Sequence, residues 1–341
     1  MENFDVAIVG GGLIGASLAT ALQRCGMRVV MIEAAEPVQT ELARVELDSR
    51  VIAIGHAAVR LMQFCNAWPL LDPARASAYT EMQVEAGATG RLSFDSNDIN
   101  ADGFPDCLGY IVENQVLLAG LQLAAEACGV TCYYHTTVKE ILEQDNRVQV
   151  VTNDAEITAN LLVAADGGSS WVREHMGIGK QQLSFDQLGL VARIRVTQPR
   201  EKTAWQRFME EGPLALLPMS DGAYSIVWSM RSECAKQTMA MPAEDFEDRL
   251  TTATQGRFGA VELLDKVRGF PLVSKRADRY FSGRVVLCGD AAHQIHPLAG
   301  QGANLGFKDV IALTDQLLAA KQSGKDLTSP RHLRIYERAR K

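Results

Sequence analysis

A glycine-rich turn near the N-terminus is the first group of residues whose types and spacing suggest chemistry. Gly10, Gly12 and Gly15 fit the pattern G-x-G-x-x-G between a strand-like and a helix-like segment, and Glu33 follows at the end of the next strand-like run. The first glycine permits a tight turn, the second lets the backbone approach a pyrophosphate, and the third lets helix and strand pack closely. Glu33 could accept hydrogen bonds from both ribose hydroxyls, and its charge argues against a 2′-phosphate at this site. The turn predicts a dinucleotide site, and this motif alone leaves both FAD and NAD open.

A second carboxylate follows an apolar run in the middle of the chain. Asp166 and Gly167 come directly after Leu162–Ala165, and the serines that follow could cap a helix carrying Arg173. Taken alone, this segment fits an ordinary strand, turn and capped helix equally well.

The third carboxylate belongs to the most informative segment of the chain. The strand-like run Arg284–Cys288 leads to Gly289 and Asp290, and a loop bounded by Pro297 then leads to a glycine-rich turn that opens a helix. A carboxylate at such a strand end can bind a polyol. The N–H groups at the start of that helix would face a ligand that gains negative charge. Together with the first two motifs, this segment predicts a cofactor site.

These residues require elements that bring them together. Apolar runs typical of buried parallel strands lie at residues 5–9, 28–32, 161–165 and 284–288. Helical patterns lie at 13–24, 112–128 and 304–321, and alternating segments typical of antiparallel strands lie at 76–106 and 188–230. We therefore predict an α/β fold with a Rossmann-like FAD- or NAD-binding domain and an inserted α+β substrate domain built on an antiparallel sheet. The first domain would comprise residues 1–75, 105–180 and 275–341, and the second residues 76–104 and 181–274.

Composition and charge narrow the class of protein. The 341 residues are 47% hydrophobic and 22% charged, which excludes disordered and collagen-like chains and favours two globular domains. A formal net charge of -7 argues against a nucleic acid partner. No apolar run reaches the ~18 residues of a membrane span, and the acidic N-terminus does not fit a signal peptide, so no integral membrane span is expected. The seven scattered cysteines predict reduced thiols in a cytoplasmic protein without a metal site.

Over nearly its whole length the chain resembles the class A flavin monooxygenases, typified by para-hydroxybenzoate hydroxylase, and more narrowly the bacterial ubiquinone-biosynthesis hydroxylases. The resemblance is carried by the N-terminal turn with Glu33 and by the segments Asp48–Ile54, Ile111–Asn114, Asp166–Gly167 and Gly289–Gly306. It implies FAD rather than NAD in the first site, with NADPH or NADH as a transient reductant.

The resemblance also implies roles for single residues. The implied cofactor contacts are Gly10, Gly12, Gly15, Glu33, Arg50, Asp166, Gly167, Gly289, Asp290, Pro297, Gly300, Gly302, Ala303 and Asn304. Arg50 is expected near the flavin or the diphosphate, Asp290 at the ribityl chain, and Pro297 on the face of the isoalloxazine. The catalytic candidates are Pro297, His293 and His296. The two histidines could polarise a phenol, although hydrogen bonds that brace the loop are the favoured interpretation.

The implied reaction is hydroxylation of a polyprenylated phenol in ubiquinone biosynthesis, with O2 as co-substrate and a flavin C4a-hydroperoxide as the oxygen donor. An apolar substrate implies peripheral access to the inner membrane. The implied protein partners are a quinone-synthesis complex or further copies of the chain in a homo-oligomer. Two alternatives stay open: a flavin hydroxylase of a soluble aromatic compound, and a non-catalytic subunit of a quinone-synthesis complex.

Two further expectations concern the substrate side. Six residues could line an apolar pocket, although half of them are expected to be plain sheet core: Trp205, Phe208, Leu214, Leu216, Met219 and Trp228. Relatives of this family are also expected to continue beyond the position of Lys341 with helices that pack near the substrate.

Overall fold

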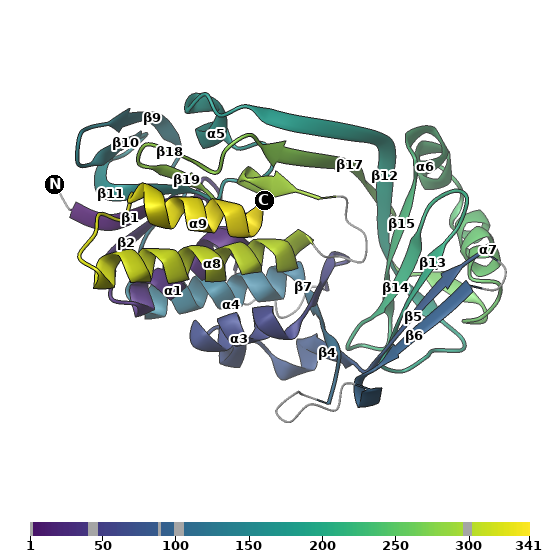
Figure 1. The fold of residues 1–341 in the computed structure, drawn as a ribbon. Coiled ribbons are helices and arrows are strands. Elements are labelled where there is room, and N and C mark those ends of the chain that lie inside the picture. Colours follow the sequence, from purple (N-terminus) through teal and green to yellow (C-terminus); the bar gives the residue numbers. More distant parts are fainter. Residues whose placement is uncertain (1–2, 40–46, 88–89, 99–105, 296–301) are drawn as a thin grey trace.

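The computed structural model describes residues 3–39, 47–87, 90–98, 106–295 and 302–341 (Figure 1). It shows a layered region of parallel strands and helices at one end and a large, mostly antiparallel sheet with two helices at the other.

The first sheet holds the strands that the apolar runs predict. Its main path has the order β18-β19-β11-β1-β2-β8, and the hairpin of β9 (Val138–Glu143) and β10 (Val148–Thr152) extends it from β11. The path consists of β1 (Asn3–Val9), β2 (Val29–Ile32), β8 (Thr131–Tyr133), β11 (Glu156–Ala164), β18 (Phe281–Ser282) and β19 (Val285–Leu287). The pairs of β1 with β2 and β11, of β2 with β8, and of β11 with β19 are parallel. The carboxyl ends of β1, β2, β11 and β19 therefore carry all three motifs to one edge of the sheet.

Helices cover this sheet with apolar faces. The layer consists of α1 (Leu13–Arg24), α4 (Asn114–Ala127), α8 (Gly302–Gln322) and α9 (Pro330–Arg340). α1 packs between α4 and α8, and α9 packs on α8. The largest buried apolar cluster lies between these helices and the sheet.

The second sheet is mostly antiparallel and has the order β20-β17-β12-β15-β14-β13-β5-β6, with β16 (Val261–Leu263) beside β12. Its strands are β5 (Glu81–Ala86), β6 (Gly90–Asp95), β12 (Lys180–Val196), β13 (Thr203–Phe208), β14 (Leu214–Pro218), β15 (Tyr224–Arg231), β17 (Arg268–Ala277) and β20 (His293–Gln294). One pair, β13 with β5, is parallel. α6 (Ser232–Met239) and α7 (Ala243–Ala253) lie against this sheet, and a second apolar core lies there. The predicted fold class is confirmed.

A small third sheet joins the two regions. It consists of β3 (Val51–Ile54), β7 (Gly109–Glu113) and β4 (Ala76–Tyr79), and α3 (His56–Phe64) follows β3. The long strands β12 and β17 run without interruption across the positions at which we placed two domain limits. We keep the domain limits as a proposal.

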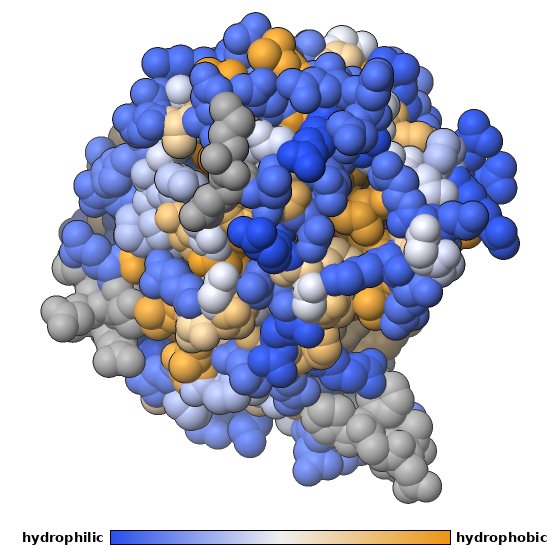
Figure 2. Space-filling view, turned by 90° about the vertical axis from the view of Figure 1, so that its left-hand side faces the viewer, coloured by the Kyte–Doolittle hydropathy of each residue, from blue (hydrophilic) through white to orange (hydrophobic). Residues whose placement is uncertain are grey.

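The molecular surface at the end formed by the first sheet is mainly hydrophilic. Figure 2 shows apolar residues there in small patches between polar ones. Among the described residues, no helix combines the length and hydropathy needed to cross a membrane.

Candidate cofactor and substrate site

The glycines of the N-terminal turn are required for two different reasons. Gly10 has φ +103°, and a Cβ at this position would overlap the carbonyl group of Ala165. A Cβ on Gly15 would overlap the carbonyl oxygen of Gly10. A Cβ on Gly12 would meet no atom of the described chain within 4 Å. Gly10 and Gly15 are thus fixed by protein packing, whereas the backbone at Gly12 faces open space at the N-terminus of α1, which suits a phosphate.

Glu33 is held at the end of β2 with its carboxylate against this turn. One oxygen accepts from the N–H of Gly11 at 2.5 Å and the other from the N–H of Ala35 at 2.8 Å. Each oxygen keeps a second lone pair for a ribose hydroxyl.

Gln122 of α4 is a residue that the sequence analysis missed. It is 4% exposed, and its Nε2 donates to the Gly11 carbonyl at 3.0 Å while its Oε1 accepts from the N–H of Val38 at 2.9 Å. Gln122 therefore fixes the turn from behind. The available signal was a polar side chain on the apolar face of a helix.

Asp166 carries an observation that points to a ligand. Its Oδ2 accepts from the N–H of Val172 at 3.0 Å, but its Oδ1 is buried and has no hydrogen-bond partner among the described residues. An unsatisfied buried acceptor is costly unless a bound donor completes it. Arg173 joins this turn to the third motif, because its guanidinium donates to the carbonyls of Gly168 at 3.2 Å and Ala291 at 2.9 Å.

The third motif forms a turn directly after β19. Gly289 has φ +64°, and Asp290 lines a cavity of about 240 Å³ together with His293 and Gly302. Burial raises the pKa of the Asp290 carboxyl; the charge of Asp309 adds to this rise, and His293 and Lys275 oppose it.

His293 is buried and bonded to protein. Its Nε2 lies 2.6 Å from Oδ2 of Asp309, so this nitrogen carries the proton and donates to the carboxylate. His296, Pro297 and Gly300 lie outside the described residues.

Asn304 connects the start of α8 to β3. Its Oδ1 accepts from the N–H of Gly55 at 3.0 Å, and its Nδ2 donates to the Ala53 carbonyl at 2.6 Å. Gly302 and Ala303 form the first turn of the same helix.

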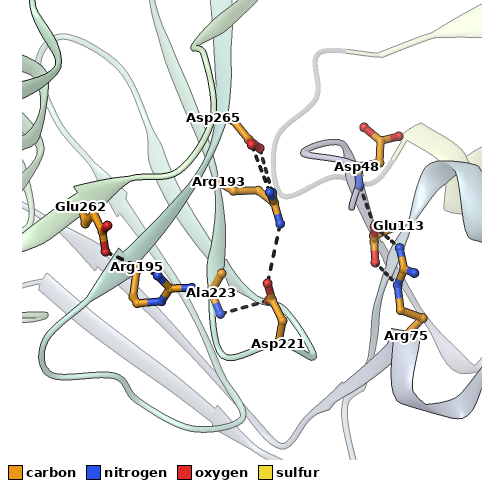
Figure 3. Close-up of polar contacts among 9 residues, drawn as sticks. All are labelled: Asp48, Arg75, Glu113, Arg193, Arg195, Asp221, Ala223, Glu262 and Asp265. Atoms are coloured by element: carbon orange, nitrogen blue, oxygen red, sulfur yellow. Dashed lines mark hydrogen bonds and ion pairs between the residues drawn. The ribbon is translucent and has the colours of Figure 1, made fainter. Parts of the chain in front are cut away.

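Arg50 has a half-exposed side chain, whose Nε lies 3.8 Å from Oδ1 of Asp48. It lines a polar cavity of about 430 Å³ with Lys266 and Arg268. Asp48 and Asp265 also line this cavity. The N–H of Asp48 donates to Glu113, which pairs with Arg75, and Asp265 pairs with Arg193 (Figure 3). The cavity wall thus holds three cationic side chains and two carboxylates.

A third cavity, of about 390 Å³, lies between β3, α3 and the second sheet. Small and apolar side chains dominate its wall, and the polar groups His56, Tyr79, Gln206, Ser229, Asn304 and Lys308 interrupt them. Because Asn304 lies in this wall, the cavity adjoins the third motif.

Four of the six pocket candidates belong to the core beneath α6 and α7: Trp205, Leu214, Leu216 and Trp228. Trp205 pairs directly with Leu216 and so lies on the core face, yet of these four it is the one that also lines the cavity. Met219 is buried without lining the cavity, and Phe208 is 40% exposed. The wall comes mainly from residues one position away, such as Ala215 and Val227.

The three motifs fit FAD. The turn before α1 offers N–H groups and open space to a diphosphate, Glu33 offers acceptors to a ribose, and Asp166 and Asp290 offer carboxylates to hydroxyl donors.

Comparisons with known proteins agree with this fit. Residues 3–341 match the family described as FAD binding domain. The chain is 33% identical to the ubiquinone biosynthesis monooxygenase COQ6 of Danio rerio, over 99% of this chain and 79% of the relative. It is 33% identical to the 3-demethoxyubiquinol 3-hydroxylase of Escherichia coli, over 98% of this chain and 85% of the relative. The crystal structure of P. aeruginosa PqsL with 2-aminobenzoylacetate matches with a TM-score of 0.84 and 23% identity, over 99% of this chain and 92% of that one.

The resemblance seen in the sequence motifs is therefore confirmed, and the chain belongs to the family of FAD-dependent monooxygenases.

Proposed function

We propose that this protein hydroxylates the aromatic ring of a polyprenylated phenol in ubiquinone biosynthesis. The observation that carries the proposal is the cavity of about 390 Å³, whose wall includes Asn304 at the end of the third flavin motif. The two relatives described above, named for ubiquinone biosynthesis and for demethoxyubiquinol hydroxylation, support the substrate class.

The residues of the three motifs would hold FAD in an extended conformation. Gly10, Gly12 and Gly15 would place the diphosphate at the N-terminus of α1, and Glu33 would bind the adenosine ribose. Asp290 would accept from the ribityl chain, and Oδ1 of Asp166 would accept a further hydrogen bond. Bound FAD, reduced by NADPH or NADH, supplies the activation of O2. The overall reaction balances as ArH + O2 + NAD(P)H + H⁺ giving ArOH + H2O + NAD(P)⁺.

The chain's own residues would orient the ring and exclude water. The apolar wall formed by residues such as Leu217 and Val227 removes water from the ring, which protects the activated oxygen from unproductive decay. His56, Tyr79 and Gln206 would position the ring hydroxyls.

An apolar strip leads from this cavity to solvent and suits the prenyl tail. Met82 lines the cavity and pairs directly with Phe94, and Val84 pairs with Leu92. Directly paired residues lie on the same face of a sheet. Phe94 is 51% exposed and Leu92 is 62% exposed, although both are apolar. We assign this strip, Met82, Val84, Leu92 and Phe94, to the first isoprene units of the tail. A tail of this kind would also bring the enzyme to the surface of the membrane that holds its substrate.

The test is NAD(P)H oxidation by the FAD-loaded protein with 2-prenylated phenols and with phenols lacking a tail. We expect ring-stimulated oxidation of NAD(P)H and one atom of ¹⁸O from ¹⁸O2 in the product. Stimulation by tail-less aromatic acids but not by prenylated phenols would favour a hydroxylase of soluble compounds. Bound flavin that NAD(P)H does not reduce would favour a non-catalytic subunit. Quinone intermediates that accumulate in a strain lacking the protein would identify the ring position.

A further inference from the structure

Asp309, in the middle of α8, is a fully buried carboxylate that no motif of the sequence analysis includes. Its Oδ2 accepts from the N–H of Gly289 at 3.0 Å and from Nε2 of His293 at 2.6 Å. Its Oδ1 accepts from Nε of Arg340 at 2.5 Å. One carboxylate thus joins the turn that carries Asp290, the strand β20 and the end of α9.

Arg340 supplies the positive charge that pairs with the Asp309 carboxylate. Its side chain is 13% exposed, and its Nη2 also donates to the Leu305 carbonyl of α8 at 3.2 Å. A buried carboxylate is costly without a counter-charge, and removal of one partner of such a pair leaves that cost uncompensated. Arginine is the suitable partner because it stays protonated at every physiological pH.

α9 also contacts β19, the strand that carries this turn. The hydroxyl of Tyr336 donates to the carbonyl of Leu287, the last residue of β19, at 2.9 Å. Glu337 accepts from the N–H of Tyr280 at 2.8 Å, beside the ring that lies 5.4 Å from His293. The helix therefore contacts β19 and the segment before it directly, and it reaches the turn after β19 through Asp309.

We propose that Arg340 is a positioning residue of the FAD site. By neutralising Asp309, it fixes the N–H of Gly289 and the ring of His293, and so the position from which Asp290 meets the cofactor. Within the described part of the chain, the hydrogen bonds of Arg340 go to Asp309, Ala339 and Leu305 and to none of the cofactor candidates. The inference requires that the chain binds FAD but does not depend on the substrate.

The test compares Arg340→Gln with Arg338→Gln, an exposed arginine on the same helix. The dissociation constant of FAD is measured by flavin fluorescence, and the melting temperature is measured without and with FAD. We expect Arg340→Gln to weaken FAD binding at least tenfold and to reduce the shift that FAD gives to the melting temperature. Arg338→Gln should bind FAD within twofold of the parent.

A second variant separates positioning from a general loss of stability. Asp309→Asn removes the buried charge that needs Arg340, so the double variant Asp309→Asn with Arg340→Gln should bind FAD more tightly than the product of the two single losses predicts. Arg340→Lys should recover part of the affinity, because it restores the charge without the fork of the guanidinium. A lower melting temperature with unchanged FAD affinity in Arg340→Gln would overturn the proposal, as would strictly multiplicative losses in the double variant. If no form of the chain bound FAD, the cofactor assignment itself would fail.

Discussion

Gly12 and Gly15 lie three residues apart in one turn, but only Gly15 is crowded by protein. We predict that Gly15→Ala lowers the free energy of unfolding by about 1–3 kcal/mol, because the methyl group would overlap the Gly10 carbonyl oxygen. Gly12→Ala should leave the stability of the FAD-free chain almost unchanged, since its Cβ meets nothing within 4 Å. The same substitution should weaken FAD binding, because the methyl group would occupy space assigned to the diphosphate.

Urea unfolding without FAD and fluorescence titration with FAD measure the two effects. Equal losses of stability in the two variants would contradict the packing argument. An unchanged FAD affinity in Gly12→Ala would contradict the assignment of the diphosphate to this turn.

Asp290 should reveal a conflict between folding and binding. Burial raises the pKa of its carboxyl above the ordinary 3.8, so the protonated form is favoured more in the folded chain than in the unfolded chain. Its favourable contribution to stability is complete below about 3.8 and is lost as pH rises through the pKa of the folded state. Asp290→Asn should therefore raise the melting temperature of the FAD-free chain at pH 7, and this gain should shrink as the pH falls towards 4.

The same variant should bind FAD about tenfold more weakly, because a charge-assisted hydrogen bond contributes ~1.5–3 kcal/mol. Calorimetry at a series of pH values and FAD titration together provide the check. A melting temperature below that of the parent at pH 7 would show that the carboxylate stabilises the fold after all.

At the scale of elements, the buried pair of Arg75 and Glu113 fixes the start of β4 on β7. The side chains are 10% and 3% exposed, two hydrogen bonds of 2.6 and 2.7 Å join them, and Glu113 also accepts from the N–H of Asp48. We predict that Glu113→Gln costs about 3–5 kcal/mol in the free energy of unfolding, because Arg75 would remain buried beside a neutral side chain.

The pair of Arg195 and Glu262, shown with it in Figure 3, gives a matched control. Its side chains are 56% and 64% exposed at 3.5 Å, so Glu262→Gln should cost no more than about 1 kcal/mol. Similar losses from the two substitutions, measured by urea unfolding, would refute the role of burial.

The elements themselves were largely predictable from the sequence. Apolar runs of four or five residues identify β1, β2, β11 and β19, because strands buried on both faces need no polar alternation. The inward face of β13 to β15 was not predictable in the same way. α6 and α7 cover one face of that sheet and the cavity lies against the other, so period-two alternation alone does not distinguish core from pocket.

The hydrogen-bond partners of buried polar side chains also could not be predicted from the sequence pattern. Asp309 and Arg340 lie on different helices, and Gln122 reaches a turn more than one hundred positions earlier in the chain. Spacing rules identify neighbours on one helix or one strand pair, whereas these contacts depend on how elements pack.

At the scale of the whole molecule, the cavity is built by parts of the chain that are distant in sequence. β3 and the start of α8 supply one wall, and the second sheet supplies the other. The two sides are also joined directly, since the buried hydroxyl of Ser225 in β15 donates to the Ser49 carbonyl at 2.7 Å. The ring site is therefore set by how the two sheets are joined, whereas the apolar strip on β5 and β6 lies at the outer edge and can be altered without disturbing the core.

That separation allows the tail assignment to be tested on its own. We predict that Leu92→Ser raises the KM for a phenol with a multi-isoprene tail about tenfold, because burying one leucine side chain contributes about 1.5–3 kcal/mol. The KM for the tail-less phenol and kcat for both should stay within twofold, since Leu92 does not line the ring cavity.

Leu142→Ser is the matched control: this leucine is 41% exposed on β9 of the other sheet. Its substitution should change neither KM. An equal rise in KM for both phenols would indicate that Leu92 contacts the ring rather than the tail. An unchanged KM for both phenols would show that the substrate does not contact the apolar strip. Because both exposed leucines become serine, a general effect of surface polarity would affect the two variants alike.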